Sequence, residues 1–134
     1  MSDEDVEAFR RAVQAFNGRD IAVLADLITE DYEFIPYLPA GAERTTTYRG
    51  RQGLRDYVKE ADEAWESLQI HLDEVRDLGD RALAFGEMRA RARVSGIDVR
   101  VPLAWVLEFR DGKVSRYQSF GDTPEAREAA ELSE

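Results

Sequence analysis

The amino-acid sequence predicts an α+β fold in which a cone-shaped, curved antiparallel sheet wraps three N-terminal helices. Apolar residues up to position 65 recur three and four positions apart, which is the spacing of helices that bury one face. From position 68 they recur at every second position, which is the period of a strand. Helices grouped before strands favour an α+β layer arrangement over alternating β–α–β units.

Three helices are expected in the first half of the chain. The first ends at Asn17, Asp20 caps the second, an extended piece over residues 32–37 follows, and the third begins after Gly50. The apolar stripes of these helices are Val6, Phe9, Val13 and Phe16, then Ile21, Leu24, Leu27 and Ile28, then Leu54, Tyr57, Val58, Ala61 and Trp65.

Four strands are expected in the second half. They cover residues 68–75, 82–94, 99–109 and 114–120, and a short helix or tail over residues 124–132 follows. A two-residue turn at Ser95 and Gly96 would place Gly86 opposite Trp105. One face of this hairpin then pairs small residues with large apolar ones, and the other face is mostly charged, so a slip of one residue is disfavoured.

Small residues on the apolar face of the strand over residues 82–94 leave volume to be filled. They are Ala84, Gly86, Ala90 and Ala92. Because protein interiors are densely packed, either helices pack close to the sheet here or the sheet wraps a cavity. We favour the cavity, since a strand glycine such as Gly86 often marks a bend or the close approach of a ligand. Pro102 predicts a bulge in the neighbouring strand.

The turn at Asp111 and Gly112 allows two arrangements of the last strand. A two-residue loop turns Val114 and Phe120 toward the core, whereas a three-residue loop turns Tyr117 and Ser119 there. We favour the longer loop, which brings Tyr117 beside Trp105.

The composition excludes several classes of protein. The chain has 134 residues, enough for one domain over residues 1–134, and it has no cysteine, which excludes disulfides and thiolate metal sites. A net charge of −10 opposes binding to nucleic acid or to a membrane surface. The acidic amino terminus is unlike a secretory leader, and we expect a cytoplasmic protein without metal or other cofactor.

Five arginines on the charged face of the sheet reverse the sign of the charge locally. They are Arg89, Arg91, Arg93, Arg100 and Arg116. Either this face is simply solvated, or it forms a two-fold homodimer in which the arginines meet Glu33, Glu87 or Glu108 around a centre made by Phe85 and Val106. We favour the homodimer.

Two motifs carry a resemblance to a known family. Tyr48-Arg49-Gly50 opens the third helix, and Arg110-Asp111-Gly112-Lys113 forms the last hairpin. With these motifs the chain resembles, over about residues 6–132, the SnoaL-like branch of the nuclear transport factor two-like superfamily. Its relatives include polyketide cyclases, ketosteroid isomerases, limonene epoxide hydrolases and scytalone dehydratases. The resemblance implies a cone that encloses one apolar pocket and dimerises through the back of the sheet.

The catalytic residues that the resemblance implies are largely missing. The position of the ketosteroid isomerase base falls at Ile35 and Pro36, and the positions of its two oxyanion donors look like Ala12 and Trp105. The Asp-Arg-Asp cluster of the epoxide hydrolases has no counterpart around Gly86, Met88 and Ser119. An inward Asp or His of the cyclase type leaves His71 and Asp122 as weak catalytic candidates.

A small hydrophobic ligand is therefore the partner that we expect. The predicted pocket consists of Phe34, Tyr57, Trp65, Met88, Trp105, Tyr117 and Ser119. One alternative is an isomerase, cyclase or dehydratase that acts on a polyketide-like or steroid-like substrate. Another is a dimerisation module whose pocket is filled by its own side chains.

Overall fold

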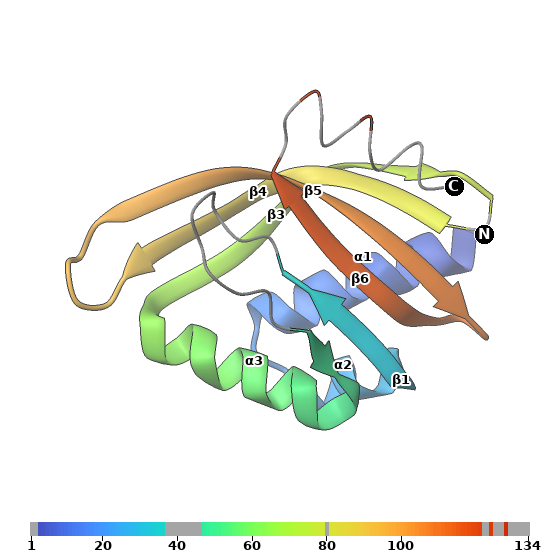
Figure 1. Cartoon of the computed structure of the whole chain (residues 1–134), viewed down its shortest axis with the longest axis horizontal. Helices are drawn as coiled ribbons and strands as arrows, with labels where there is room; N and C mark the ends of the chain where they lie inside the picture. The colour runs from blue at the N-terminus through green and yellow to red at the C-terminus, as the bar shows by residue number, and fades with distance from the viewer. Residues whose placement is uncertain (1–2, 37–46, 80, 122–123, 125–127, 129–134) are drawn as a thin grey trace.

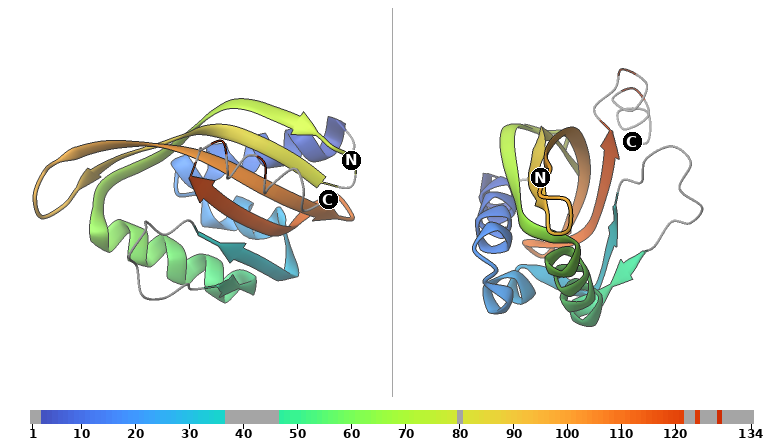
Figure 2. Two further views of the ribbon diagram at one scale, coloured as in Figure 1. Left: turned by 45° about the horizontal axis from the view of Figure 1, so that its top comes forward. Right: turned by 90° about the vertical axis from the view of Figure 1, so that its left-hand side faces the viewer.

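The structure is a computed structural model that describes residues 3–36, 47–79, 81–121, 124 and 128. It confirms the α+β fold: three helices lie along one side of a single curved sheet of six strands (Figures 1 and 2). The helices are α1 (Asp3–Asn17), α2 (Ile21–Asp26) and α3 (Gly50–Ala64). The strands are β1 (Ile28–Ile35), β2 (Tyr48–Arg49), β3 (Trp65–Asp77), β4 (Arg81–Ala92), β5 (Asp98–Arg110) and β6 (Lys113–Gly121).

The sheet is mixed, whereas the sequence predicted an antiparallel one. Its strand order is β2-β1-β6-β5-β4-β3, and β1 runs parallel to β6. β1 begins at Ile28, earlier than expected. The sequence predicted a later start because the apolar spacing of α2 continues to Ile28. The helix ends at Asp26, and the carbonyl oxygen of its C-cap residue Leu27 accepts a hydrogen bond from Val114 N at 2.9 Å, which joins the start of β1 to β6.

The carboxyl end of α1 is tied to the sheet and to α3. The Asn17 side chain pairs with the backbone of Ile70 in β3. Its Nδ2 atom donates to the carbonyl oxygen of Ile70 at 2.9 Å, and its Oδ1 atom accepts from the Ile70 N–H at 2.8 Å. Arg19 donates to the carboxylate of Asp62 on α3 at 3.0 Å and to the carbonyl oxygen of Leu68 on β3 at 3.0 Å. The three elements are thus held together at one end. The expected cap of α2 is also present, since Asp20 accepts from Val23 N.

The register of β4 and β5 differs from the prediction by two residues. Gly86 lies opposite Leu103, and Trp105 lies opposite Ala84. The connection is longer than a two-residue turn, because Ala92 N donates to Ile97 O at 2.9 Å. A shift of two residues keeps each side chain on its predicted face.

Arg93 in this connection is not part of the arginine group on the outer face, contrary to expectation. Its guanidinium donates to the carbonyl oxygens of Asp62 and Trp65, and its backbone N–H donates to Ala64 O. It therefore satisfies carbonyl groups at the carboxyl end of α3, which a helix otherwise leaves without partners.

Two irregularities lie elsewhere than predicted. Pro102 makes no bulge with β4: it faces Glu87 within a continuous register and lies one residue beyond the last described β5–β6 pair, Leu103 with Gly121. Gly86 admits the backbone of β3 rather than a ligand. A Cβ at Gly86 would lie 2.0 Å from the carbonyl oxygen of His71, beside the register shift between β3 and β4.

The last hairpin combines both arrangements considered for it. Asp111 and Gly112 have φ of 54° and 77° and form a two-residue turn, so the predicted three-residue loop is wrong. A register shift follows between Glu108 and Phe109 of β5. The extra residue in β6 allows Val114 to face the core while Tyr117 and Ser119 line the same side further along the strand.

The outer face of the sheet has its own apolar cluster. Phe85 and Val106 are only 4% and 8% exposed, and they pack with Leu83, Ala104 and partly buried neighbours. The structure therefore buries within one chain the side chains that were expected at the centre of a homodimer. None of the described helices combines the length and the apolar character needed to cross a membrane.

Most of the outer arginines find acidic partners within the chain. Arg100 and Arg89 both bind the carboxylate of Glu87, and their hydrogen bonds lower its pKa to about 2, Arg100 having the larger effect. Arg116 lies 3.5 Å from Glu108, and Arg91 lies 3.2 Å from Glu66. The positive charge that the sequence gathers on this face is thus balanced locally.

Candidate functional site

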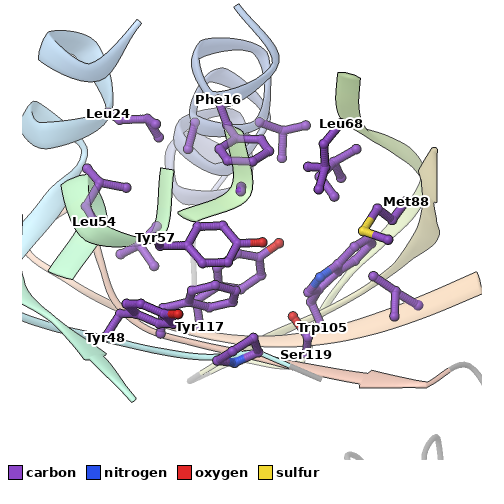
Figure 3. A pocket seen from close by; sticks show the side chains of 18 of the residues that line it. Phe16, Leu24, Tyr48, Leu54, Tyr57, Leu68, Met88, Trp105, Tyr117 and Ser119 are labelled. Carbon is purple, nitrogen blue, oxygen red and sulfur yellow. The ribbon is translucent and has the colours of Figure 1, made fainter. Parts of the chain in front are cut away.

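A cavity of about 570 Å³ lies between the helices and the sheet (Figure 3). All seven predicted pocket residues line it: Phe34, Tyr57, Trp65, Met88, Trp105, Tyr117 and Ser119. Further aromatic rings in the lining are Phe9, Phe16, Tyr32 and Tyr48, and most of the remaining wall is aliphatic. The cavity is therefore largely apolar, and its walls come from all three helices and from every strand of the sheet.

The cavity does not lie where the small residues of β4 suggested. Ala84 is fully buried, and Ala90 packs with Ala61 of α3 and Leu68 of β3, so protein atoms cover both. In the described lining, β5 contributes the most residues of the sheet, β1, β3 and β6 contribute fewer, and β4 contributes Met88 alone. The empty volume lies beside this small buried cluster, whose members Ala61 and Leu68 also line the cavity.

Aromatic rings hold one another in the wall around Phe34. The centre of its ring lies 4.7 Å from that of Tyr57 in an edge-on arrangement and 5.0 Å from that of Tyr117 in a stacked one. Tyr48 stacks on the same ring at 6.1 Å, and Phe9 meets Tyr117 edge-on at 5.9 Å. Such contacts fix ring orientations, so the shape of this wall is set before anything binds.

Three phenol groups with a raised pKa line the cavity. They belong to Tyr32, Tyr57 and Tyr117. Burial raises the pKa of each phenol, and for Tyr117 the neighbouring phenols Tyr32 and Tyr57 raise it further. All three are therefore uncharged at neutral pH and carry an O–H that can donate a hydrogen bond.

One carboxylate stands at the edge of the cavity. Among the described lining residues, Glu60 is the only one with a formal charge; it is exposed, and it accepts a hydrogen bond from the Tyr48 hydroxyl. Tyr32, Tyr48 and Glu60 also line the cavity and were not predicted to do so. Glu60 follows Tyr57 by three residues, which places both on one face of α3, a spacing that could have identified it.

The described part of the chain places neither catalytic candidate at the cavity. The His71 side chain is 53% exposed, does not line the cavity, and has its Nε2 atom 3.4 Å from Asp73. Asp122 lies outside the described residues. Ala12, Pro36 and Trp105, the positions compared with ketosteroid isomerases, do line the cavity, and none of their side chains can act as a general base at neutral pH.

Three solved structures show the same fold. An NTF2-like protein of unknown function from Burkholderia pseudomallei is 21% identical, with a TM-score of 0.78 over 93% of this chain and 95% of its own. TerC, co-crystallized with polyporic acid, is 22% identical, with a TM-score of 0.78 over 96% and 99%. A protein with a ketosteroid isomerase-like fold from Catenulispora acidiphila, in complex with trimethylamine, is 17% identical, with a TM-score of 0.74 over 94% and 91%.

Sequence comparisons give the family. A comparison with curated protein sequences finds no match. The sequence profile of the SnoaL-like domain matches residues 9–117, a span that includes nearly all of the described lining of the cavity. Together with the fold, this match shows that the chain belongs to the family of SnoaL-like domains.

Proposed function

We propose that this SnoaL-like domain binds a small, largely apolar molecule in the cavity between its helices and sheet. The observation that carries the proposal is the cavity itself: about 570 Å³, within the usual range of ligand sites, in a protein interior that would otherwise be densely packed. Its aromatic lining suits an apolar occupant. Two proteins of the same fold have been crystallized with small molecules, which supports the proposal.

Filling the cavity should prevent binding. Val99 and Val101 line it from one face of β5, and replacing both by tryptophan would place two indole rings in the empty volume. We expect the affinity for N-phenyl-1-naphthylamine, a neutral apolar probe that fluoresces in apolar surroundings, to fall about tenfold or more. The measurement is a fluorescence titration.

The matched control adds the same two side chains outside the cavity. Val94 and Ile97 are 101% and 61% exposed on the connection between β4 and β5, so their replacement by tryptophan should leave the probe affinity unchanged. Failure of the unmodified protein to bind the probe, or equal affinities for the two double variants, would contradict the proposal. Thermal melting of both variants checks that they fold.

The homodimer through the outer face of the sheet, and the cytoplasmic location, remain predictions of the sequence. Side chains of Arg89, Arg91 and Arg100 keep 48%, 51% and 66% exposure on this face although each pairs with a carboxylate of its own chain, so all three remain accessible to a second copy. We expect light scattering at low salt to give about 30 kDa, twice the 15.2 kDa of one chain. The mass of a single chain at micromolar concentration would refute the homodimer.

A further inference from the structure

We propose that the occupant of the cavity is uncharged and presents a hydrogen-bond-accepting oxygen, such as a ketone carbonyl, to the hydroxyl groups of Tyr57 and Tyr117. The inference rests on the proposed function and narrows it to a chemical class of ligand. It follows from the positions of these two side chains, from the balance of donors and acceptors in the lining, and from the distribution of charge around it.

The two hydroxyl groups reach the cavity from different walls. Tyr57 comes from α3 and Tyr117 from β6, and both side chains extend into the pocket (Figure 3). Each ring packs against Phe34, at 4.7 Å and 5.0 Å between ring centres. The rings are therefore held in place relative to one another, and a bound molecule would meet two donors in fixed positions.

Among the described residues, the lining offers hydroxyl donors that no protein acceptor uses. Within the described part of the chain, the hydroxyl groups of Tyr57 and Tyr117 have no hydrogen-bond partner, and neither does that of Tyr32 beside them. The one carboxylate in the described lining, Glu60, already accepts from Tyr48. The hydroxyl groups of Tyr32, Tyr57 and Tyr117 open on the cavity, and among the described residues none of them is a fully buried unpaired atom. An acceptor oxygen brought by the ligand would take the place of water at donors that no described protein group occupies.

The charges around the cavity oppose an anionic ligand. The described lining includes no Lys, Arg or His, and its one formal charge is the carboxylate of Glu60. Arg19, the cation that acts electrostatically on Tyr57, directs its N–H groups to Asp62 and to the carbonyl oxygens of Phe16 and Leu68. A carboxylate or phenolate in the cavity would lose its hydration without gaining a counter-ion, which is costly. The acceptor oxygen is therefore that of a neutral molecule.

The test compares three probes that share one bicyclic body. They are tetralin, 1-tetralone, which adds a ketone, and 1,2,3,4-tetrahydronaphthalene-1-carboxylate, which adds a negative charge. Their affinities are measured by calorimetry or by quenching of tryptophan fluorescence, since Trp65 and Trp105 line the cavity. We expect 1-tetralone to bind about threefold to tenfold more tightly than tetralin, and the carboxylate to bind more weakly than both.

Variants assign the preference to the two hydroxyl groups. Replacing Tyr57 and Tyr117 together by phenylalanine should reduce the affinity for 1-tetralone to that for tetralin and leave the affinity for tetralin unchanged. Tyr48→Phe is the matched control, because its hydroxyl already donates to Glu60, and it should keep the preference for the ketone. The control also lines the cavity, so it reproduces the loss of a phenol oxygen from the wall.

The outcomes separate the inference from the proposed function. If tetralin and 1-tetralone bind equally, if the carboxylate binds as tightly as the ketone, or if the Tyr57 and Tyr117 variant keeps the preference, the inference is overturned while the binding of apolar molecules stands. If neither tetralin nor 1-tetralone binds, both the proposed function and the inference fail.

Discussion

Replacing Gly86 by alanine is expected to destabilise the domain by about 3 kcal/mol or more. The added Cβ would lie 2.0 Å from the carbonyl oxygen of His71 and 3.1 Å from the Cα atom of Leu72, so β3 and β4 would have to move apart. Backbone atoms within a strand pair cannot rotate away as a side chain does. Urea denaturation followed by circular dichroism measures the change in the free energy of unfolding.

Gly18→Ala provides the control for this substitution. Its Cβ would meet its nearest neighbour, the carbonyl oxygen of Gln14, at 3.5 Å, which is an ordinary contact. We expect the free energy of unfolding to change by less than about 1 kcal/mol. Equal effects of the two substitutions would show that the close approach of β3 to Gly86 is not what demands glycine there.

Trp105→Ala is expected to cost about 3–5 kcal/mol of stability and to weaken binding of the apolar probe. The indole is 1% exposed, yet it also lines the cavity, so the same side chain belongs to the core and to the wall of the proposed site. Its removal would lose buried apolar contacts and enlarge the cavity. Urea denaturation gives the first effect, and titration with N-phenyl-1-naphthylamine gives the second.

Trp65→Ala is the comparison for this result. Trp65 lines the same cavity but is only partly buried at the start of β3, so its loss should cost less stability than the loss of Trp105. If Trp105→Ala were no more destabilising than Trp65→Ala, the deep burial of Trp105 would not contribute as proposed. If its stability fell but probe binding were unaffected, Trp105 would act in the core alone.

The face of each strand was predictable, whereas the pairing of neighbouring strands was not. Alternation assigns Met88 and Trp105 to the inner face whatever the loop, because the side-chain period is two residues. The opposing residue depends on the connection, and here Arg93 leaves the hairpin to bind carbonyl groups at the end of α3. That contact joins segments about thirty residues apart, and no short-range pattern in the sequence predicts it.

The parallel pairing of β1 with β6 and the register shift between Glu108 and Phe109 are likewise products of tertiary structure. A strand's partner across more than eighty residues is chosen by the packing of the whole sheet. The place of the turn was predictable from Asp111 and Gly112, but its length was not, since the predicted three-residue loop is wrong. The extra residue in β6 was not predictable either, because it arises where Val114 and Tyr117 both gain burial on one side.

The cavity residues were predicted better than the reason for the cavity. Large aromatic side chains on inner faces, such as Phe34 and Trp105, identify a wall from pattern alone. The position of the empty volume depends on how the helices pack against the whole sheet, and Ala90 is covered by the buried cluster that it shares with Ala61 and Leu68. Tyr32 was overlooked because it lies at the edge of the expected extended piece. Glu60 is exposed although it borders the cavity, so its charge gave no sign of a place in the wall.

The contacts of Arg19 bear on the thermodynamics of binding. This one guanidinium connects the end of α1 with α3 and with β3, through Phe16, Asp62 and Leu68. An incoming molecule consequently finds helices that are already in place. The conformational entropy lost on association is then confined to the molecule itself and a few side chains, so that more of the contact energy remains as affinity.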